Sequence, residues 1–546
     1  MHSLRRIPPF AGSTAILSAT LLLSSCAHSP STPTEISRSV MSQQPTVTTY
    51  PVPPMKATLT RSVLPNGLEV LVLPRPDLPL VSFRLGIRAG SSFDPSGKAG
   101  TAALAADLLT RGTAGHDTLS LFRTLDATGG SLSASASRDM TVLAGDSLSS
   151  EAPTLLELAS EMVSSPTFPP AEFEKKKEST LASLTEEDNH PSPIATNLLY
   201  RLVEKGTPYA TPSSGTPASV EKITRQDLLN FVAQYYRPDR AVLVVAGDVT
   251  PDSALALAKK YFSTWQAPAS APPLPARRSF SSISTSGTYL VDKPELRQST
   301  VFYGTQGIAR KDPSFYDSLV FNMLLGASQT STLNRVVRQK MGLVYYIHSA
   351  LDASRHRGPF IVYFQTYAKN TGKVMGAMNS ILADSVRTTP DPSAVRAIKR
   401  QLVGGFPFLM NTTPKIAQLL LVIWSDGLDY TYFTDYPEHV SKVTPASVLA
   451  AGQHLINGHS FVTVVVGPAK SLKKAGVTGT PPPPASLNAK APSPTGGSLF
   501  SLALPQTPRV FNTLLASFLL AHHRQRISPH RILWRSGIFH YERGCR

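Results

Sequence analysis

Apolar and polar positions alternate near the start of two regions of the chain. In the first region, LTRSVLPNGLEVLVLP (59–74) places Asn66 and Gly67 between two alternating runs, a pattern that predicts a β-hairpin. LVSFRLGIRAG (80–90) then has apolar residues at every second position from 81 to 87, which predicts a strand with one buried face. An amphipathic helical pattern follows at 100–111. We therefore expect strands first and helices afterwards.

The second region repeats this plan. QSTVFYGTQGI (298–308) predicts a strand, and SFYDSLVFNMLL (314–325) predicts the helix after it. Residues 223–247 also align without gaps on 443–467: in both, a threonine precedes a short helix, a polar turn follows, and a valine-rich strand ends in glycine. The shared order and length indicate a duplication. The predicted fold class is α+β, with two homologous domains whose sheets are mostly antiparallel.

Composition divides the chain further, because stretches rich in Pro, Ser and Thr separate the two regions and follow the second. The predicted segments are a signal peptide (1–26), a flexible tether (27–57), a first domain (58–265), a linker (266–286), a second domain (287–472), a Pro-rich linker (473–498) and a basic tail (499–546). We expect the tail to be disordered; peripheral membrane contact and a reading-frame artefact are the alternatives. At 546 residues the chain is too long for one hydrophobic core.

The charge of the chain does not indicate a nucleic-acid partner. The formal net charge is +17, which in principle suits nucleic acid or an anionic membrane. Much of the excess lies in the tail, where seven arginines and one acid, Glu542, follow residue 490. No RNA-binding or zinc-knuckle motif accompanies these arginines. We therefore expect no nucleic acid among the partners.

The first residues look like a bacterial export signal. Two arginines precede AILSATLLL (15–23), which is too short to span a bilayer. The run ends in Leu-Ser-Ser-Cys, similar to a lipobox, so Cys26 is predicted to carry a lipid; an ordinary signal peptide with an incidental cysteine is the alternative. Because Ala27 is not the aspartate that suggests inner-membrane retention, we expect a lipid-anchored protein of the bacterial cell envelope, on the outer membrane and facing the periplasm. Cys545 is the only other cysteine, so no disulfide framework is expected.

Several motifs together resemble the insulinase-like (pitrilysin-type, inverted zincin) metallopeptidase family. In the first half these are LPNGLEVLVLP, RAGSSFDPSGKAG and the segment from TPSSGTPASVEKI to VLVVAGDVT. In the second half they are STLNRVVRQKMGLVYYIHSAL and GPFIVYFQT. The resemblance covers nearly all of 58–472. It implies duplicated halves, each with a sheet packed against a layer of helices, and the ancestry of a zinc metalloendopeptidase.

Active members of that family carry His-x-x-Glu-His on the helix that here spans 100–111. Two histidines one turn apart bind the same Zn²⁺, and the glutamate activates the metal-bound water. The resemblance places Ala103 and Asp107 at the histidine positions and Ala106 at the position of the base. The downstream glutamate ligand falls at Ser183, with a shift of one turn left open. Since one carboxylate cannot hold zinc alone, we expect no metal in this chain and zinc in a partner subunit.

A second part of the family's site is retained. Active members place an arginine and a tyrosine seven residues apart in the half without zinc, where they bind the peptide and stabilise the reacting carbonyl. RQKMGLVY supplies Arg338 and Tyr345 at that spacing. A guanidinium offers fixed donors to a carbonyl, and a phenol donates to an oxyanion. The alternative is structural, with Arg338 on the surface of a helix that Gly342 ends and Tyr345 partly buried.

The resemblance also implies a division of labour, because in several bacterial relatives one chain holds zinc and the other holds the Arg/Tyr pair. We therefore predict a peptidase-like subunit, non-catalytic alone, that forms a heterodimer with a zinc-bearing homologue and binds peptide substrates. A non-enzymatic envelope scaffold or peptide-binding protein that retains the peptidase fold is the alternative. A self-sufficient peptidase with an unrecognised site is a third hypothesis.

Other motifs are assigned structural roles. Residues 145–148 spell GDSL, a serine esterase motif, but the chain lacks that family's later Asp-x-x-His, so a turn is predicted here. His116 is predicted in a loop, with Asp117 capping the next helix. His348 and His356 have no third ligand at metal spacing and are predicted to serve packing or the surface.

Overall fold

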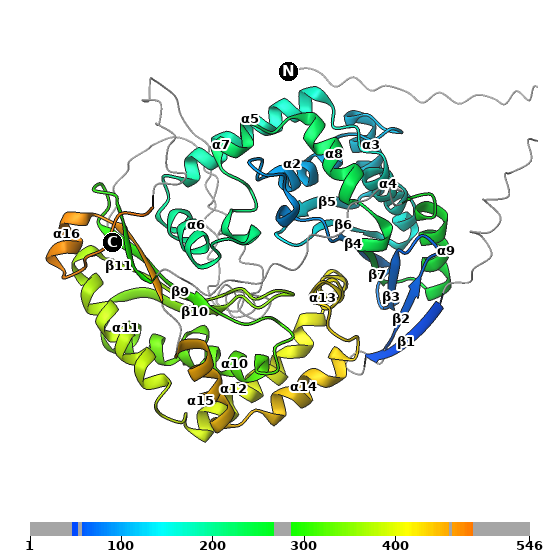
Figure 1. Cartoon of the computed structure of the whole chain (residues 1–546). Coiled ribbons are helices and arrows are strands. Elements are labelled where there is room, and N and C mark those ends of the chain that lie inside the picture. Colours follow the sequence, from blue (N-terminus) through cyan, green and yellow to red (C-terminus); the bar gives the residue numbers. More distant parts are fainter. Residues whose placement is uncertain (1–45, 53–56, 267–285, 458–460, 484–546) are drawn as a thin grey trace, which may run out of the picture. The chain divides into compact units, whose positions relative to one another are not determined.

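The computed structural model describes residues 46–52, 57–266, 286–457 and 461–483 (Figure 1). All of the described residues belong to a single structural unit. The signal peptide, Cys26, most of the tether and of the first linker, the end of the Pro-rich linker and the basic tail lie outside the described residues. The predictions for these segments therefore stay predictions. Two of their ends are described and differ from the prediction: residues 46–52 of the predicted tether form a β-strand, and in the predicted Pro-rich linker Val477 is buried and Thr480 forms a β-bridge to Tyr289.

The first sheet contains the predicted hairpin. Its strands follow the order β1-β2-β3-β7-β4-β6-β5. They are β1 (Thr46–Val52), β2 (Ala57–Val63), β3 (Glu69–Pro74), β4 (Leu80–Ile87), β5 (Ser131–Ala136), β6 (Thr141–Leu148) and β7 (Ala241–Gly247). β3 and β7 are parallel, and the other described neighbours are antiparallel. Gly67 takes the left-handed conformation (φ +92°) that the turn between β2 and β3 requires.

The second sheet repeats the core of the first. Its order is β10-β11-β9-β12-β8. The strands are β8 (Gly287–Asp292), β9 (Gln298–Gln306), β10 (Val344–Leu351), β11 (Pro359–Tyr367) and β12 (Val462–Gly467). As β3 runs parallel to β7 in the first sheet, β8 runs parallel to β12 in the second, and the other described pairs are antiparallel. The prediction of two homologous halves with mostly antiparallel sheets is confirmed.

The helices of the first half lie between β4 and β5, between β6 and β7, and after β7. They are α2 (Thr101–Leu108), α3 (Thr118–Thr128), α4 (Ala152–Ser164), α5 (Pro170–Glu187), α6 (Pro191–Val203), α7 (Pro217–Val220), α8 (Arg225–Tyr235) and α9 (Pro251–Phe262). The short helical segments are η2 (Ser91–Phe93), η3 (Leu109–Arg111), η4 (Ser149–Glu151), η5 (Pro208–Ala210) and η6 (Pro238–Arg240). Thr224 caps α8 through a reciprocal hydrogen-bonded capping box, as the repeat predicts.

The second half has the same succession. Its helices are α10 (Phe315–Asn322), α11 (Thr371–Ser385), α12 (Pro392–Gly405), α13 (Thr413–Asp426), α14 (Tyr432–Lys442), α15 (Pro445–Ile456) and α16 (Ala469–Lys474). The short helical segments are η7 (Met323–Ala327), η8 (Asn334–Lys340), η9 (Ala368–Asn370) and η10 (Phe406–Met410). Thr444 caps α15 with the same capping box that Thr224 forms in the first half.

In each half, helices of that half pack on one face of the sheet. One helix of the other half packs on the opposite face. α13 packs on β4 and β7, and α6 packs on β9 and β12; we call α6 and α13 the exchanged helices. Leu421 of α13 lies over Gly86, where a Cβ atom would approach its Cδ1 to 2.4 Å. Leu199 of α6 lies over Gly304, where a Cβ would approach its Cδ1 to 2.8 Å. Each glycine thus makes room for a leucine of the other half.

Two strand predictions need correction. Every residue of β4 from 81 to 87 is buried, so the strand does not have one solvent-facing side. The alternation is real, but α13 covers the more polar face. Residues 145–148 are not a turn; they belong to β6. Gly145 is needed there because the ring of Phe83 lies over it, 2.2 Å from where a Cβ atom would be.

In the part of the chain that the structure describes, no single helix is long and apolar enough to cross a membrane. α12 with η10, taken together with α13, reaches that length and apolar content, but a bend of 113° separates the two pieces. Apolar side chains of both pieces are buried in the largest hydrophobic core, including Leu402, Leu420 and Ile423.

Candidate functional site

The helix that would carry the zinc motif, α2, is built regularly. Its first turn is capped by Asp94, whose carboxylate accepts hydrogen bonds from the backbone N–H groups of Gly100 (2.7 Å) and Ala102 (2.8 Å). Burial raises the pKa of Asp94 to about 7, against the effect of these two bonds. Ala106 is fully buried in the core, and Ala103 is half-buried. Neither alanine has an atom that binds metal or moves a proton.

Asp107, the remaining polar residue at the motif positions, is paired with a lysine. Its carboxylate forms an ion pair with Lys176 of α5, with 2.8 Å between Oδ2 and Nζ. Ser183 lies about two turns further along α5, is exposed, and donates its hydroxyl to the backbone carbonyl of Ser179. Two alanines and one carboxylate already paired with an ammonium do not fit a zinc ion. Within the described ranges, no group of three or more His, Cys, Asp or Glu side chains is arranged to hold a metal.

Arg338 and Tyr345 lie close together. Arg338 belongs to η8, and its guanidinium carbon is 5.8 Å from the centre of the Tyr345 ring, within the range of a cation–π interaction. Its Nη1 donates a long hydrogen bond (3.5 Å) to Oε1 of Gln329. The side chain of Tyr345 is 84% exposed, so it is not the partly buried tyrosine of the structural alternative. Both side chains present donors to solvent, which suits contact with a peptide carbonyl.

The backbone around this pair is irregular at three points. η8 is a π-helical segment, a rare geometry that is frequent at functional sites. Gly342 then adopts a left-handed conformation (φ +62°) that ends the helix. Tyr345 follows as an extra residue in β10: Val344 pairs with Thr366 and Tyr346 with Gln365, so Tyr345 forms a β-bulge. Bulges re-aim side chains next to active sites, and this one turns a large aromatic ring into solvent.

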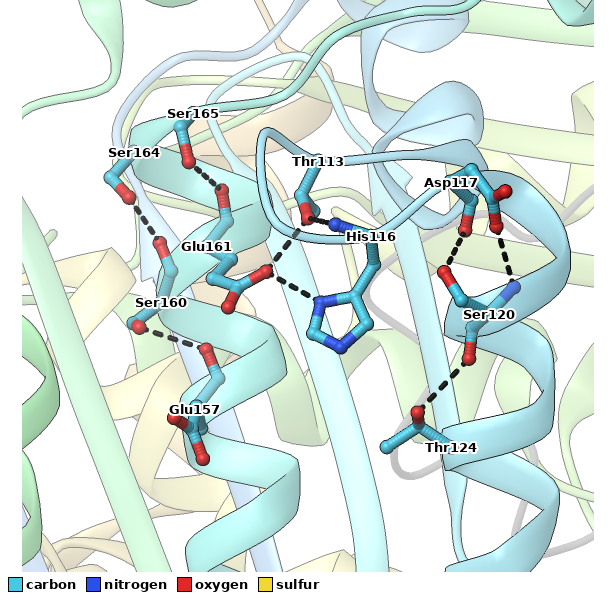
Figure 2. Close-up of polar contacts among 10 residues, drawn as sticks. All are labelled: Thr113, His116, Asp117, Ser120, Thr124, Glu157, Ser160, Glu161, Ser164 and Ser165. Atoms are coloured by element: carbon cyan, nitrogen blue, oxygen red, sulfur yellow. Dashed lines mark hydrogen bonds and ion pairs between the residues drawn. The ribbon is translucent and has the colours of Figure 1, made fainter.

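His116 belongs to a loop fastened to α4 (Figure 2). One oxygen of Glu161 accepts from the Thr113 hydroxyl (2.7 Å) and lies 2.9 Å from Nδ1 of His116. The same hydroxyl oxygen of Thr113 accepts from the His116 backbone N–H. Because the hydroxyl donates to the carboxylate and not to the imidazole, this is not a nucleophile–base arrangement. Asp117 caps α3 by accepting from the N–H of Ser120, as predicted.

His348 and His356 pack against aromatic rings, which is one of the two roles predicted for them. His348 lies 5.6 Å from the Tyr363 ring in an edge-on contact, and burial lowers its pKa to about 4. His356 lies 6.0 Å from the ring of Tyr209. Both therefore serve packing within the fold.

Two buried acids escaped the sequence analysis. Glu204 and Asp426 each lie five residues after the leucine that covers a glycine of the other half, at the ends of the exchanged helices. They are 3% and 6% exposed, and burial raises the pKa of each to about 7. The charged groups around Glu204 are Arg138, Arg357 and Asp352, and those around Asp426 are Arg310, Asp139 and Asp352. Their equivalent places in the two helices are a signal that the repeat could have supplied.

Models of one protein family match residues in both halves of the chain. The family model described as "Insulinase (Peptidase family M16)" matches residues 70–216, and "Peptidase M16 inactive domain" matches 222–402. An uncharacterized zinc protease of Mycobacterium leprae is 25% identical over 424 residues, which are 76% of this chain and 93% of that protein.

Two solved structures are similar over most of the chain. A peptidase M16 inactive domain from Pseudomonas fluorescens has a TM-score of 0.68 and 25% identity, covering 80% of this chain and 99% of that one. A protease from Helicobacter pylori has a TM-score of 0.67 and 18% identity, covering 78% and 100%. At that identity the second similarity shows the fold alone.

Proposed function

The chain belongs to the insulinase (M16) peptidase family, and we propose that it is a peptidase-like subunit that cannot hydrolyse peptides alone. It pairs with a zinc-bearing homologue and contributes Arg338 and Tyr345 to the binding and hydrolysis of unfolded peptides. A zinc ion held by the partner would supply the activated water that attacks the peptide bond. In this chain, Arg338 orients a peptide carbonyl and Tyr345 donates to the oxyanion.

The observation that carries this proposal is the exposure and backbone geometry of the Arg/Tyr pair. Tyr345 is exposed on a β-bulge, with the Arg338 guanidinium beside its ring. A purely structural pair would bury the tyrosine or use a regular strand, because exposing a large ring on an irregular backbone adds nothing to stability. The helix α2, which has kept its fold while carrying two alanines and an ion-paired aspartate, supports the assignment of zinc to the partner.

A pull-down from host membranes in mild detergent tests the partnership first. Mass spectrometry of the recovered complex should identify a stoichiometric homologue with His-x-x-Glu-His. Recovery of this chain alone, or with unrelated envelope proteins, would favour the scaffold alternative. Cleavage of peptides by the purified chain in the presence of a chelator would contradict both and restore the self-sufficient peptidase.

Substitutions in the two-subunit complex then test the role of the pair. Arg338→Ala and Tyr345→Phe should each lower the rate of peptide hydrolysis about 100-fold, the usual effect of losing one transition-state donor. Arg335→Ala, an exposed arginine of the same helix, and Tyr367→Phe, an exposed tyrosine at the end of β11, are the matched controls. Full activity in both test variants would overturn the catalytic-support role.

The membrane anchor is part of the same proposal. The lipobox-like end of the predicted signal peptide supports a lipid on Cys26, which would anchor the chain ahead of its first folded domain. Cys26→Ser should move the protein from the membrane fraction to the soluble periplasmic fraction. Continued membrane association of that variant would show that another segment holds the protein.

A further inference from the structure

Asn334 is a buried polar residue in a place that apolar side chains otherwise occupy. It is the first residue of η8 and is 6% exposed, with buried Leu333 before it and buried Val337 one turn after it. Its amide nitrogen Nδ2 lies 3.1 Å from the carbonyl oxygen of Ser328, 3.2 Å from Oγ of Ser331 and 3.4 Å from the carbonyl oxygen of Ile347. Two amide hydrogens thus face three acceptors.

These acceptors belong to the segments that hold the Arg/Tyr pair. Ser328 and Ser331 flank Gln329, whose side chain accepts the hydrogen bond from Arg338. Asn334 itself lies four residues before Arg338, about one turn of the same helix. Ile347 lies in β10, two residues after Tyr345. One amide therefore ties together the turn that orients the guanidinium, the helix that carries it and the strand that carries the phenol.

An apolar residue at 334 would fill the same space but would take one donor away from each of these acceptors. The carbonyl of Ser328 would keep the backbone N–H of Ser331 (3.2 Å), and Oγ of Ser331 would keep the backbone N–H of residue 334 (3.4 Å). Buried carbonyl groups that lose a hydrogen bond are costly, so the segments would separate to reach water. The least regular parts of the backbone lie on either side of Asn334: the π-helical segments η7 and η8 and the bulge at Tyr345. The Asn334 amide adds a polar link to the apolar packing of η7 and η8 on β10, and to backbone hydrogen bonds such as that from the N–H of Gly342 to the carbonyl of Arg338.

We propose that Asn334 is a positioning residue for the Arg/Tyr pair: its side-chain amide sets the place of Arg338 relative to Tyr345. It does not touch the substrate. The importance of this placement for peptides rests on the function proposed above, whereas the placement itself can be tested without any peptide.

The first experiment measures the geometry. The full chain is prepared with 3-fluorotyrosine at position 345, because the fluorine resonance senses a guanidinium beside the ring. Arg338→Ala supplies the reference shift for a ring without its cation. We expect Asn334→Leu to move the resonance most of the way to that reference. Should Asn334→Leu fail to fold, Asn334→Asp, which keeps the shape but removes the donors, takes its place.

A matched control separates positioning from the general loss of a buried amide. Asn322 is equally buried, and its Oδ1 accepts from the Ser349 hydroxyl of the same strand β10, away from Arg338. Asn322→Leu should leave the fluorine resonance in place. An unchanged resonance in Asn334→Leu, or an equal movement in Asn322→Leu, would overturn the proposal.

The second experiment connects the geometry to peptide binding. With fluorescein-labelled casein as an unfolded polypeptide, Asn334→Leu should weaken binding to the full chain about five- to tenfold in the wild-type background. In the Arg338→Ala background it should weaken binding no further, because its effect acts through Arg338. Additive losses would indicate a merely structural role and contradict the proposal. If Arg338→Ala itself leaves the affinity unchanged, the proposed function fails, and the fluorine measurement still decides the role of Asn334.

Discussion

The helix pair α2–α5 of the first half and the segment η8–β10 of the second half differ in where their backbone is irregular. In the first half both helices are regular: α2 is capped by Asp94, buries Ala106 and is held to α5 by the ion pair of Asp107 and Lys176. Positive φ angles lie beside these helices and not within them, at Gly100 before α2 and at Phe168 before α5. In the second half a π-helical segment, a left-handed glycine and a β-bulge follow one another within a dozen residues. Local irregularity is what sequences tolerate at functional sites and remove elsewhere.

This difference teaches where to look for function in a duplicated fold. The frame is shared, since the same strand order, capping threonines and exchanged helices occur in both halves. What differs is the departure from regular geometry. A position that keeps a large exposed ring on a β-bulge has a stronger claim to function than a well-packed helix that only aligns with a motif.

The largest expected effect tests whether the frame is the same in both halves. Gly86→Val and Gly304→Val each place side-chain atoms where a leucine of the exchanged helix already lies. We expect each to lower the free energy of unfolding by about 3 kcal/mol, the upper end for overpacking a core. Urea denaturation of the full chain measures this, with Gly376→Ala as control, because a Cβ there meets nothing within 4 Å.

Removing the leucine that each new side chain would meet tests the same two contacts further. Leu421→Ala should recover part of the loss in the Gly86→Val background, and Leu199→Ala should do the same for Gly304→Val. A large effect in one half and none in the other would break the equivalence of the two frames.

The second effect concerns the two buried acids that end the exchanged helices. The pKa of Glu204 and of Asp426 is raised to about 7 by burial, so the folded protein binds more protons than the unfolded chain between about pH 4 and 7. Their contribution to stability is therefore fully present at low pH and is lost as pH rises toward 7; Asp94 contributes in the same direction. We expect Glu204 and Asp426 each to lower the free energy of unfolding by about 2.5 kcal/mol from pH 5 to pH 8.

Substitution of both acids tests whether Glu204 and Asp426 cause this pH dependence. Glu204→Gln together with Asp426→Asn should flatten most of the slope in denaturation curves recorded at both pH values. If stability instead rose over this range, or if the slope were unchanged in the double variant, these groups would not be protonated in the folded protein.

A smaller effect is expected at the former zinc helix. Lys176→Met should lower the free energy of unfolding by less than about 1 kcal/mol, because both partners of the ion pair are partly exposed and screened by water. The same denaturation measurement applies, and its salt dependence should be weak. A loss of several kcal/mol would mean that this ion pair is a structural replacement for the metal, and it would weaken the contrast between the two regions.

The smallest expected effect is that of zinc itself. The melting temperature of the isolated chain should change by less than about 1 °C when zinc is added after treatment with a chelator, since a ligand that does not bind the folded state does not stabilise it. Differential scanning fluorimetry measures this. A clear increase in melting temperature with zinc would contradict the expectation that this chain binds no metal.

The local structure was largely predictable from the sequence. The hairpin around Asn66 and Gly67, the capping threonines at 224 and 444 and the cap at Asp117 follow from neighbouring residues. The Arg338–Tyr345 spacing was also visible, whereas the exposure of the tyrosine was not. Asn334 could have been noticed as a polar residue between apolar helix positions, but its three acceptors come from segments that only folding brings together.

The sequence by itself determined the two-fold plan of this protein, because hairpins, caps and amphipathic periods depend on residues a few positions apart. Only the tertiary structure decided which helix covers which sheet. The alternation in β4 predicts one buried face, but packing of α13 from the other half buries the second. The tertiary structure also decided that Glu204 and Asp426, the acids that follow Leu199 and Leu421, lie in the interior. Such contacts join residues hundreds of positions apart, and no local pattern records them.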